Sequence, residues 1–149
     1  MVKTLYTAVA TATDRGRNGR TRTDDGKLDL ALSMPEAMGG PGGEGTNPEQ
    51  LFAAGDAACF ANAIRSAARR DGHEDVVDGA TVTAHVDIGA IGGGRFGLAV
   101  RLDVTVPALE QTDAEHLVAK AHERCPYSNA TRGNIPVQLA VHAGAVPSP

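Results

Sequence analysis

The chain has 149 residues, the length of one ordinary domain with a sizeable hydrophobic core. Its net charge of −4 argues against nucleic acid as the main partner, because phosphate binding needs concentrated positive charge. No apolar run reaches the roughly 18 residues that span a bilayer and the N-terminus lacks a signal-peptide pattern, so we expect one cytoplasmic domain over residues 1–149 with no membrane partner.

The N-terminal part has the pattern of a β-hairpin. Residues 4–13 alternate enough to predict a strand, and residues 28–32 alternate again. The segment between them carries four arginines, at positions 15, 17, 20 and 22, broken by two glycines, and this pattern indicates a solvated turn. The glycine-rich residues 39–46 lack the Gly-Lys-Ser/Thr ending of a phosphate-binding loop, so we interpret them as a flexible connection.

A long helix is predicted from Asn47 to about Arg70. Asn47 suits the N-cap, Pro48 the first helical position, and Glu49 the first turn, where a carboxylate favours the helix dipole. The middle of the segment is rich in alanine, which lets another backbone approach closely. We therefore expect a buried central helix.

The second half of the chain predicts another hairpin, a second helix and a last strand. Residues 81–91 and 96–106 alternate on either side of three glycines, and residues 112–115 fit a capping box for a helix that ends near Arg124. Residues 135–141 predict the last strand. The order of the elements implies an α+β fold, with helices packed on largely antiparallel sheet.

The chain has two cysteines, too few for a secreted disulfide scaffold. A buried cysteine among alanines, such as Cys59, is more often an inert hydrophobic residue than a reactive one. Cys125 precedes Pro126, which makes it a natural helix C-cap. If one sulfur attacks and the other resolves, Cys59 is the better attacker, because the negative end of a helix disfavours a thiolate at Cys125.

The two cysteines also allow other interpretations. A cysteine hydrolase would pair Cys59 with His85 or His122, and a small lipid-binding protein would need neither sulfur. Metal binding is not expected, because no Cys-x-x-Cys or compact histidine pair is present. Four apolar residues are candidates for a pocket wall, although core packing explains each equally well: Leu51, Phe52, Phe60 and Phe96.

Two motifs carry a family resemblance. They are GTNPEQLFAAGDAACF at residues 45–60 and CPYSNATRGN at residues 125–134. Together with the start of the chain and the middle hairpin, they closely resemble the organic hydroperoxide resistance (Ohr) branch of the Ohr/OsmC family. The resemblance covers nearly the whole chain.

The resemblance implies a thiol-dependent peroxidase that reduces organic hydroperoxides, including those of fatty acids, to alcohols. It makes Cys59 the peroxidatic cysteine, which passes through a sulfenic acid, and Cys125 the resolving cysteine, which forms a disulfide with it. Arg17 and Glu49 match the family's arginine and glutamate. The resemblance further implies an interwound homodimer with its sites at the interface, no bound cofactor or metal, and a lipoylated protein as the reductant.

Two departures from the family pattern concern the expected site. Asp56 stands where the family usually has an aromatic residue, and we expect its side chain to face solvent. The turn around Arg17 is one residue longer than usual, which makes Arg15 a rival for the site arginine. Glu49 and Cys59 are separated by about 15 Å along a straight helix, so either a long arginine side chain bridges them or Glu49 serves the thiol of the partner subunit. Our hypothesis is that each site draws on both subunits.

Overall fold

The computed structural model describes residues 1–144. They divide into two compact units, Met1–Leu51 and the chain from Phe52 onward, and each unit has its own three-stranded sheet. None of the helices in this described part of the chain is long and apolar enough to cross a membrane.

The first unit contains short antiparallel strands in the order β1-β2-β3. These strands are β1 (Ala10–Ala12), β2 (Arg20–Thr23) and β3 (Asp29–Ala31), and 3₁₀ turns occupy Gly16–Asn18 and Glu36–Met38. The strand predicted over residues 4–13 is therefore only three residues long. The expected solvated turn was also wrong in its second half, where β2 lies.

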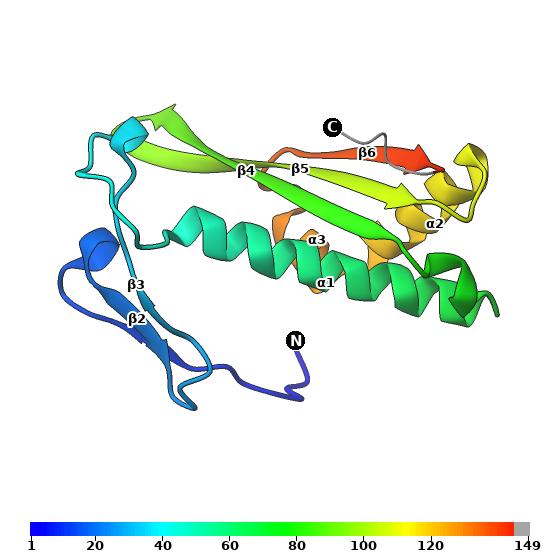
Figure 1. Ribbon diagram of the computed structural model, residues 1–149, viewed down its shortest axis with the longest axis horizontal. Helices are drawn as coiled ribbons and strands as arrows, with labels where there is room; N and C mark the ends of the chain where they lie inside the picture. The colour runs from blue at the N-terminus through cyan, green and yellow to red at the C-terminus, as the bar shows by residue number, and fades with distance from the viewer. Residues whose placement is uncertain (145–149) are drawn as a thin grey trace. The chain divides into compact units, whose positions relative to one another are not determined.

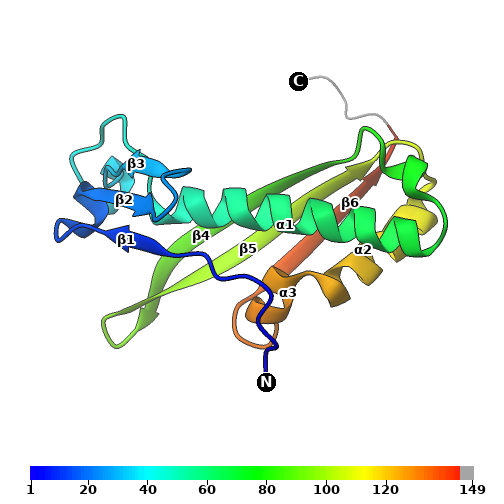
Figure 2. The same cartoon turned by 90° about the horizontal axis from the view of Figure 1, so that it is seen from below.

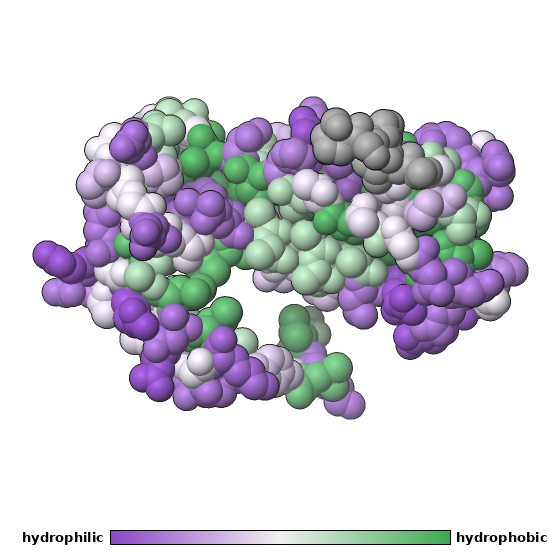
Figure 3. All heavy atoms as spheres, viewed as in Figure 1, coloured by the Kyte–Doolittle hydropathy of each residue, from purple (hydrophilic) through white to green (hydrophobic). Residues whose placement is uncertain are grey.

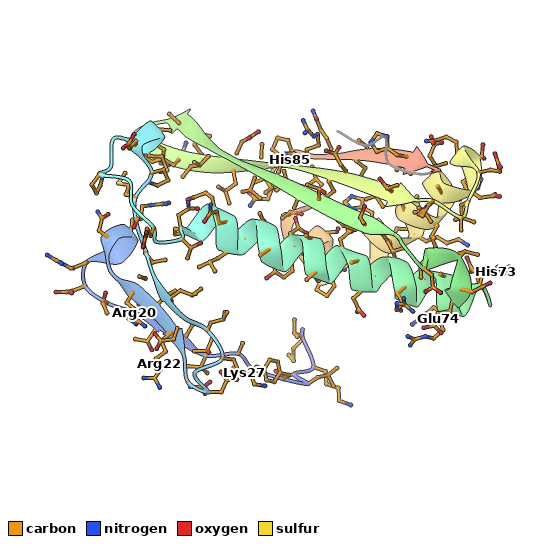
Figure 4. All side chains as sticks on the ribbon, viewed as in Figure 1. Arg20, Arg22, Lys27, His73, Glu74 and His85 are labelled. Carbon is orange, nitrogen blue, oxygen red and sulfur yellow. The ribbon has the colours of Figure 1, made fainter. Side chains whose placement is uncertain are left out.

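Strand β2 forms because β-branched threonines alternate with arginines whose charged groups remain in solvent. Arg20 donates from Nε to Asp29 Oδ1 of β3 at 2.6 Å, which ties the two strands together. Figure 4 shows Arg20 and Arg22 on β2 and Lys27 in the turn that follows it.

Helix α1 (Pro48–Arg70) has the predicted bounds. The Asn47 side chain caps it, since Oδ1 accepts a hydrogen bond from the Gln50 backbone N–H at 2.8 Å. One face of the helix is buried in the core through Phe60, Ile64 and neighbouring alanines. The opposite face carries exposed alanines, and Figure 3 shows the resulting weakly hydrophobic surface over α1.

The second unit is built on strands β4 (Thr81–Gly92), β5 (Arg95–Val106) and β6 (Val137–Ala143). β4 and β5 form the predicted antiparallel hairpin, and its tight turn uses Gly93 and Gly94 at positive φ. β6 pairs with β5 in parallel, so the sheet is mixed rather than antiparallel throughout. The reason is the connection: helices carry the chain back across the sheet before β6 begins.

Helices α2 (Gln111–Arg124) and α3 (Pro126–Thr131) connect β5 to β6, and a 3₁₀ turn at Glu74–Val77 follows α1. The capping box predicted at residues 112–115 was wrong: α2 begins at Gln111, whose side chain donates to Glu115 and to the Val141 carbonyl of β6, both at 2.8 Å. Figure 1 and Figure 2 show α1 and α2 on the same face of the sheet, where their buried residues meet those of β5.

Candidate active site

The two sulfurs lie in contact within the second unit. Cys59 stands on α1 next to the buried Phe60, and Cys125 stands at the joint between α2 and α3. Their Sγ atoms are 3.6 Å apart, with the Cys125 thiol donating toward Cys59, and both cysteines are free thiols. Cys125 is fully buried, whereas Cys59 is partly open to solvent. Cys59 is therefore the sulfur that a reagent can reach.

Cys125 ends α2 as its C-cap, as predicted, and is also the N-cap of α3. Its backbone N–H donates to the Ala121 carbonyl at 2.9 Å, and its own carbonyl accepts from Asn129 at 2.9 Å. Pro126 has no N–H and suits the first position of α3. The sequence therefore turns the chain at this residue and directs the thiol inward.

The surroundings of Cys59 within the second unit favour the neutral thiol. Burial raises the pKa of Cys59, and a hydrogen bond from the Tyr127 backbone N–H opposes that rise. The neighbouring Cys125 and the carboxyl group of Asp56 raise the pKa of Cys59 further. A thiolate here needs a compensating positive charge.

Asp56 does not face solvent as expected; only 3% of it is exposed. It continues the buried stripe of α1 one turn before Phe60, because residues three and four apart share a helix face. Burial raises the pKa of Asp56. Within the described residues of the second unit, no hydrogen bond or ion pair joins Asp56 to another side chain.

Arg17 and Glu49 form a bidentate ion pair within the first unit. Arg17 donates from Nη1 and Nη2 to the two carboxylate oxygens of Glu49, at 2.8 and 2.7 Å. The hydrogen bonds from Arg17 lower the pKa of Glu49 and hold it ionised. Arg15, the rival arginine, lies exposed at the residue before the 3₁₀ turn that carries Arg17. Of these two arginines, Arg17 is the one with a fixed guanidinium.

An apolar groove of about 670 Å³ lies in the second unit and includes Tyr127, the residue whose backbone contacts Cys59. Phe52 meets the Tyr127 ring edge-on at a centroid distance of 5.8 Å. Gly55 leaves room for that ring, since a Cβ there would lie 2.6 Å from the Tyr127 hydroxyl. The other lining residues are Ile91, Phe96, Gly97, Leu98, Ala130, Thr131, Asn134, Ile135 and Pro136.

The pocket-wall candidates from the sequence had mixed outcomes. Phe52 and Phe96 line the groove, whereas Phe60 is fully buried in the core. The sequence did not identify Leu98 of β5 or Ile135, which precedes β6, because alternation does not reveal which apolar residues remain open to a groove.

Neither candidate histidine forms a catalytic pair with a sulfur. His85 lies on the outer face of β4, opposite the core-facing Ala84 and Val86, and contacts Asp103 at 2.9 Å. Figure 4 labels His85 on this strand. The Nδ1 atom of His122 contacts Ser128 Oγ at 2.9 Å. Within residues 1–144 no group of three histidine, cysteine or acidic residues could hold a metal ion.

Comparison with known proteins places this chain in a family. Residues 40–140 match the profile of the OsmC-like protein family. An organic hydroperoxide resistance protein of Xanthomonas axonopodis pv. citri is 51% identical over 139 residues, which cover 93% of this chain and 96% of that protein. The chain therefore belongs to the OsmC-like family. Within that family its relatives are organic hydroperoxide resistance proteins, which confirms the resemblance of the two cysteine motifs.

Solved structures agree with this placement. An organic hydroperoxide resistance protein of Legionella pneumophila superposes with a TM-score of 0.88 at 50% identity, covering 94% of this chain and 99% of that one. One from Vibrio cholerae, with captopril bound in one of its active sites, gives 0.86 at 52% identity and covers 93% of each chain. The α+β fold class expected from the sequence is thus confirmed.

Proposed function

We propose that this protein is a thiol-dependent peroxidase that reduces organic hydroperoxides, including those of fatty acids, to alcohols. The observation that carries the proposal is the contact between the two free thiols, at 3.6 Å, with one partly open and the other buried behind it. Such a pair suits an attacking and a resolving cysteine. Membership of the organic hydroperoxide resistance branch supports the substrate class.

The proposed reaction has three steps. The Cys59 thiolate attacks the terminal peroxide oxygen, the O–O bond breaks, and the departing alkoxide takes a proton to give the alcohol. Cys59 is then a sulfenic acid, and the Cys125 thiol displaces its hydroxyl as water while the disulfide forms. An external dithiol, such as the lipoyl group of a partner protein, reduces the disulfide by exchange.

The proposal assigns the compensating positive charge to Arg17. The near surroundings of Cys59 raise its pKa, so the first step needs a cation that favours the thiolate and polarises the peroxide. Glu49 fixes the Arg17 guanidinium through two short hydrogen bonds, which keeps its orientation during the reaction.

The groove beside Tyr127 supports an organic substrate over hydrogen peroxide. Its wall is largely apolar, and burying alkyl surface gains about 0.8 kcal/mol for each methylene group. The same groove would suit a lipid carrier, but a carrier would not require the thiol pair.

We further propose that the protein works as an interwound homodimer with each site drawing on both subunits. Exposed alanines on α1 and exposed apolar residues such as Leu5, Tyr6 and Phe96 leave apolar surface for a second copy to cover. A dilution series tests the dimer, if the sedimentation and the activity of the protein are measured at each concentration. A fully active monomer would contradict the proposal.

The decisive test is single-turnover oxidation of the reduced protein, followed by mass analysis of the two sulfurs. We expect an organic hydroperoxide to yield one equivalent of alcohol and a Cys59–Cys125 disulfide, faster than hydrogen peroxide does. A hydrolase or a lipid carrier would consume no peroxide. If the reduced protein consumed no peroxide and formed no disulfide, the proposal would be refuted.

A further inference from the structure

A set of polar contacts joins α2 to α3 around Cys125. His122, in the last turn of α2, contacts Ser128 Oγ of α3 through Nδ1 at 2.9 Å. Arg132, which follows α3, donates from Nη2 to the His122 backbone carbonyl at 2.5 Å and from Nη1 to Asn129 Oδ1 at 2.7 Å. Cys125 lies between the residues that these contacts connect, and Figure 2 shows α3 turning away from the end of α2 at this joint.

His122 also reaches the helix that bears the other sulfur. Its ring packs against Phe60 with a centroid distance of 6.4 Å, and Phe60 is the residue after Cys59. Burial, and then the nearby Arg132, lower the pKa of His122, so its imidazole is held neutral. A neutral imidazole bonds to a serine hydroxyl as donor or as acceptor. His122 therefore contacts both segments that position the two thiols.

The backbone alone holds this joint weakly. α3 has only six residues, and so short a helix is marginal without tertiary contacts. Ser128 is 3% exposed, so the hydroxyl that meets His122 is shielded from competing water. The side-chain contacts therefore add to the backbone hydrogen bonds of Cys125 and to its packing in the core in fixing the angle between α2 and α3 and the place of the Cys125 sulfur.

We propose that His122 and Ser128 are positioning residues for the second chemical step, holding the Cys125 thiol against Cys59 so that the sulfenic acid is captured rapidly. The inference rests on the proposed peroxidase function. In that step the new S–S bond replaces the S–O bond of Cys59, and the Cys125 proton leaves with the hydroxyl as water. Neither His122 nor Ser128 exchanges electrons with the sulfurs.

The test compares the two steps in one protein. Ser128→Ala and His122→Phe both remove the hydrogen bond between His122 and Ser128, and His122→Phe keeps an aromatic ring beside Phe60. His122→Asn restores a polar group near the position of Nδ1. His116→Phe, at an exposed position of the same helix, is the matched control. Rapid mixing with an organic hydroperoxide, followed by a sulfenic-acid trap and mass analysis, gives the rates of sulfenic acid and disulfide formation.

We expect Ser128→Ala and His122→Phe to slow disulfide formation about tenfold, and at least fivefold more than they slow sulfenic acid formation. The double variant should be no slower than the slower single variant, because both remove one bond. His122→Asn should recover part of the rate, and His116→Phe should behave as wild type. Equal rates of disulfide formation in all variants, or equal slowing of both steps with no recovery in His122→Asn, would overturn the proposal.

A second oxidant separates this inference from the peroxidase function. The Cys59 thiolate adds to the N=N bond of diamide. The Cys125 thiol then attacks the Cys59 sulfur, which forms the same disulfide and releases diamide as its hydrazine. If wild type does not react with peroxide but its diamide-driven disulfide formation still slows in Ser128→Ala, the peroxidase proposal fails and the positioning role stands. If peroxide reacts and neither oxidant distinguishes the variants, the positioning role fails alone.

Discussion

Asp56→Asn is expected to lower the pKa of Cys59. The carboxyl group lies one helical turn from the thiol, on the buried stripe of α1, with no side-chain cation paired to it in residues 1–144. Neighbours at this spacing are about 6 Å apart. With an effective dielectric constant of about 40, between that of a protein surface and that of water, two unit charges at this separation repel by about 1.4 kcal/mol. Removing the charge of Asp56 should then lower the pKa of Cys59 by about one unit.

The assay is the pH dependence of Cys59 alkylation by iodoacetamide in the Cys125→Ser background, which leaves one thiol to titrate. Asp87→Asn is the matched control, since it removes the same charge from the exposed face of β4. We expect about tenfold more thiolate in Asp56→Asn at a pH below the thiol pKa, and no change in Asp87→Asn. An unchanged titration would refute the electrostatic argument, and a rise would show that Asp56 supports a cation of the assembled site.

Four further outcomes are expected. Cys59→Ser abolishes peroxide consumption, whereas Cys125→Ser retains the first oxidation and stops at a sulfenic or over-oxidised Cys59 by mass analysis; equal loss of the first step in both would reverse the assigned roles. Arg17→Gln slows sulfenic acid formation about a hundredfold, and Arg15→Gln serves as control, since a larger effect there would make Arg15 the site arginine. In a series of alkyl hydroperoxides, each added methylene raises kcat/KM about two- to fourfold until the groove is filled. If kcat/KM did not change with chain length, the groove would not be the substrate site. Arg17 lowers the pKa of Glu49 below its usual 4.5, so the ion pair stabilises the fold fully above that pH, and the contribution disappears as the pH falls through the lower folded pKa. Urea unfolding should therefore show a difference in stability between wild type and Glu49→Gln at pH 7 that shrinks as the pH falls below 4.5, and a difference independent of pH would contradict this.

Local signals in the sequence were sufficient for the long elements. The start of α1 could be predicted because Asn47 suits the N-cap and Pro48 the first helical position, and the helix ends at Arg70, about where it was expected to. The hairpin of β4 and β5 followed from alternation around three glycines. Two of the short elements could not be predicted: β2 is a run of arginine and threonine with no apolar pattern, and α3 is too short to show a period. The short strand β3 was predicted by the alternation of residues 28–32.

The candidate site depended on information that spacing does not contain. Cys59 and Cys125 are 66 positions apart, and nothing in their local patterns places them in contact; only the family resemblance paired them. The burial of Asp56 was missed because a carboxylate three residues before a cysteine fits an exposed face as well as a buried one. His122 was visible as a residue, but its contact with Ser128 forms only where the chain turns from α2 into α3 at Cys125.

The contact between the sulfurs has a consequence for chain entropy. A covalent bond between Cys59 and Cys125 would close a loop that contains the whole β4–β5 hairpin and α2. For a loop of this size, the loss of freedom in the unfolded chain amounts to about 4 kcal/mol in the loop-closure description. In the proposed reaction, the disulfide form would then be more resistant to heat and to proteases than the dithiol form. Each round of the proposed reaction would thus stabilise this segment of the chain when the disulfide forms and remove that stabilisation when the disulfide is reduced.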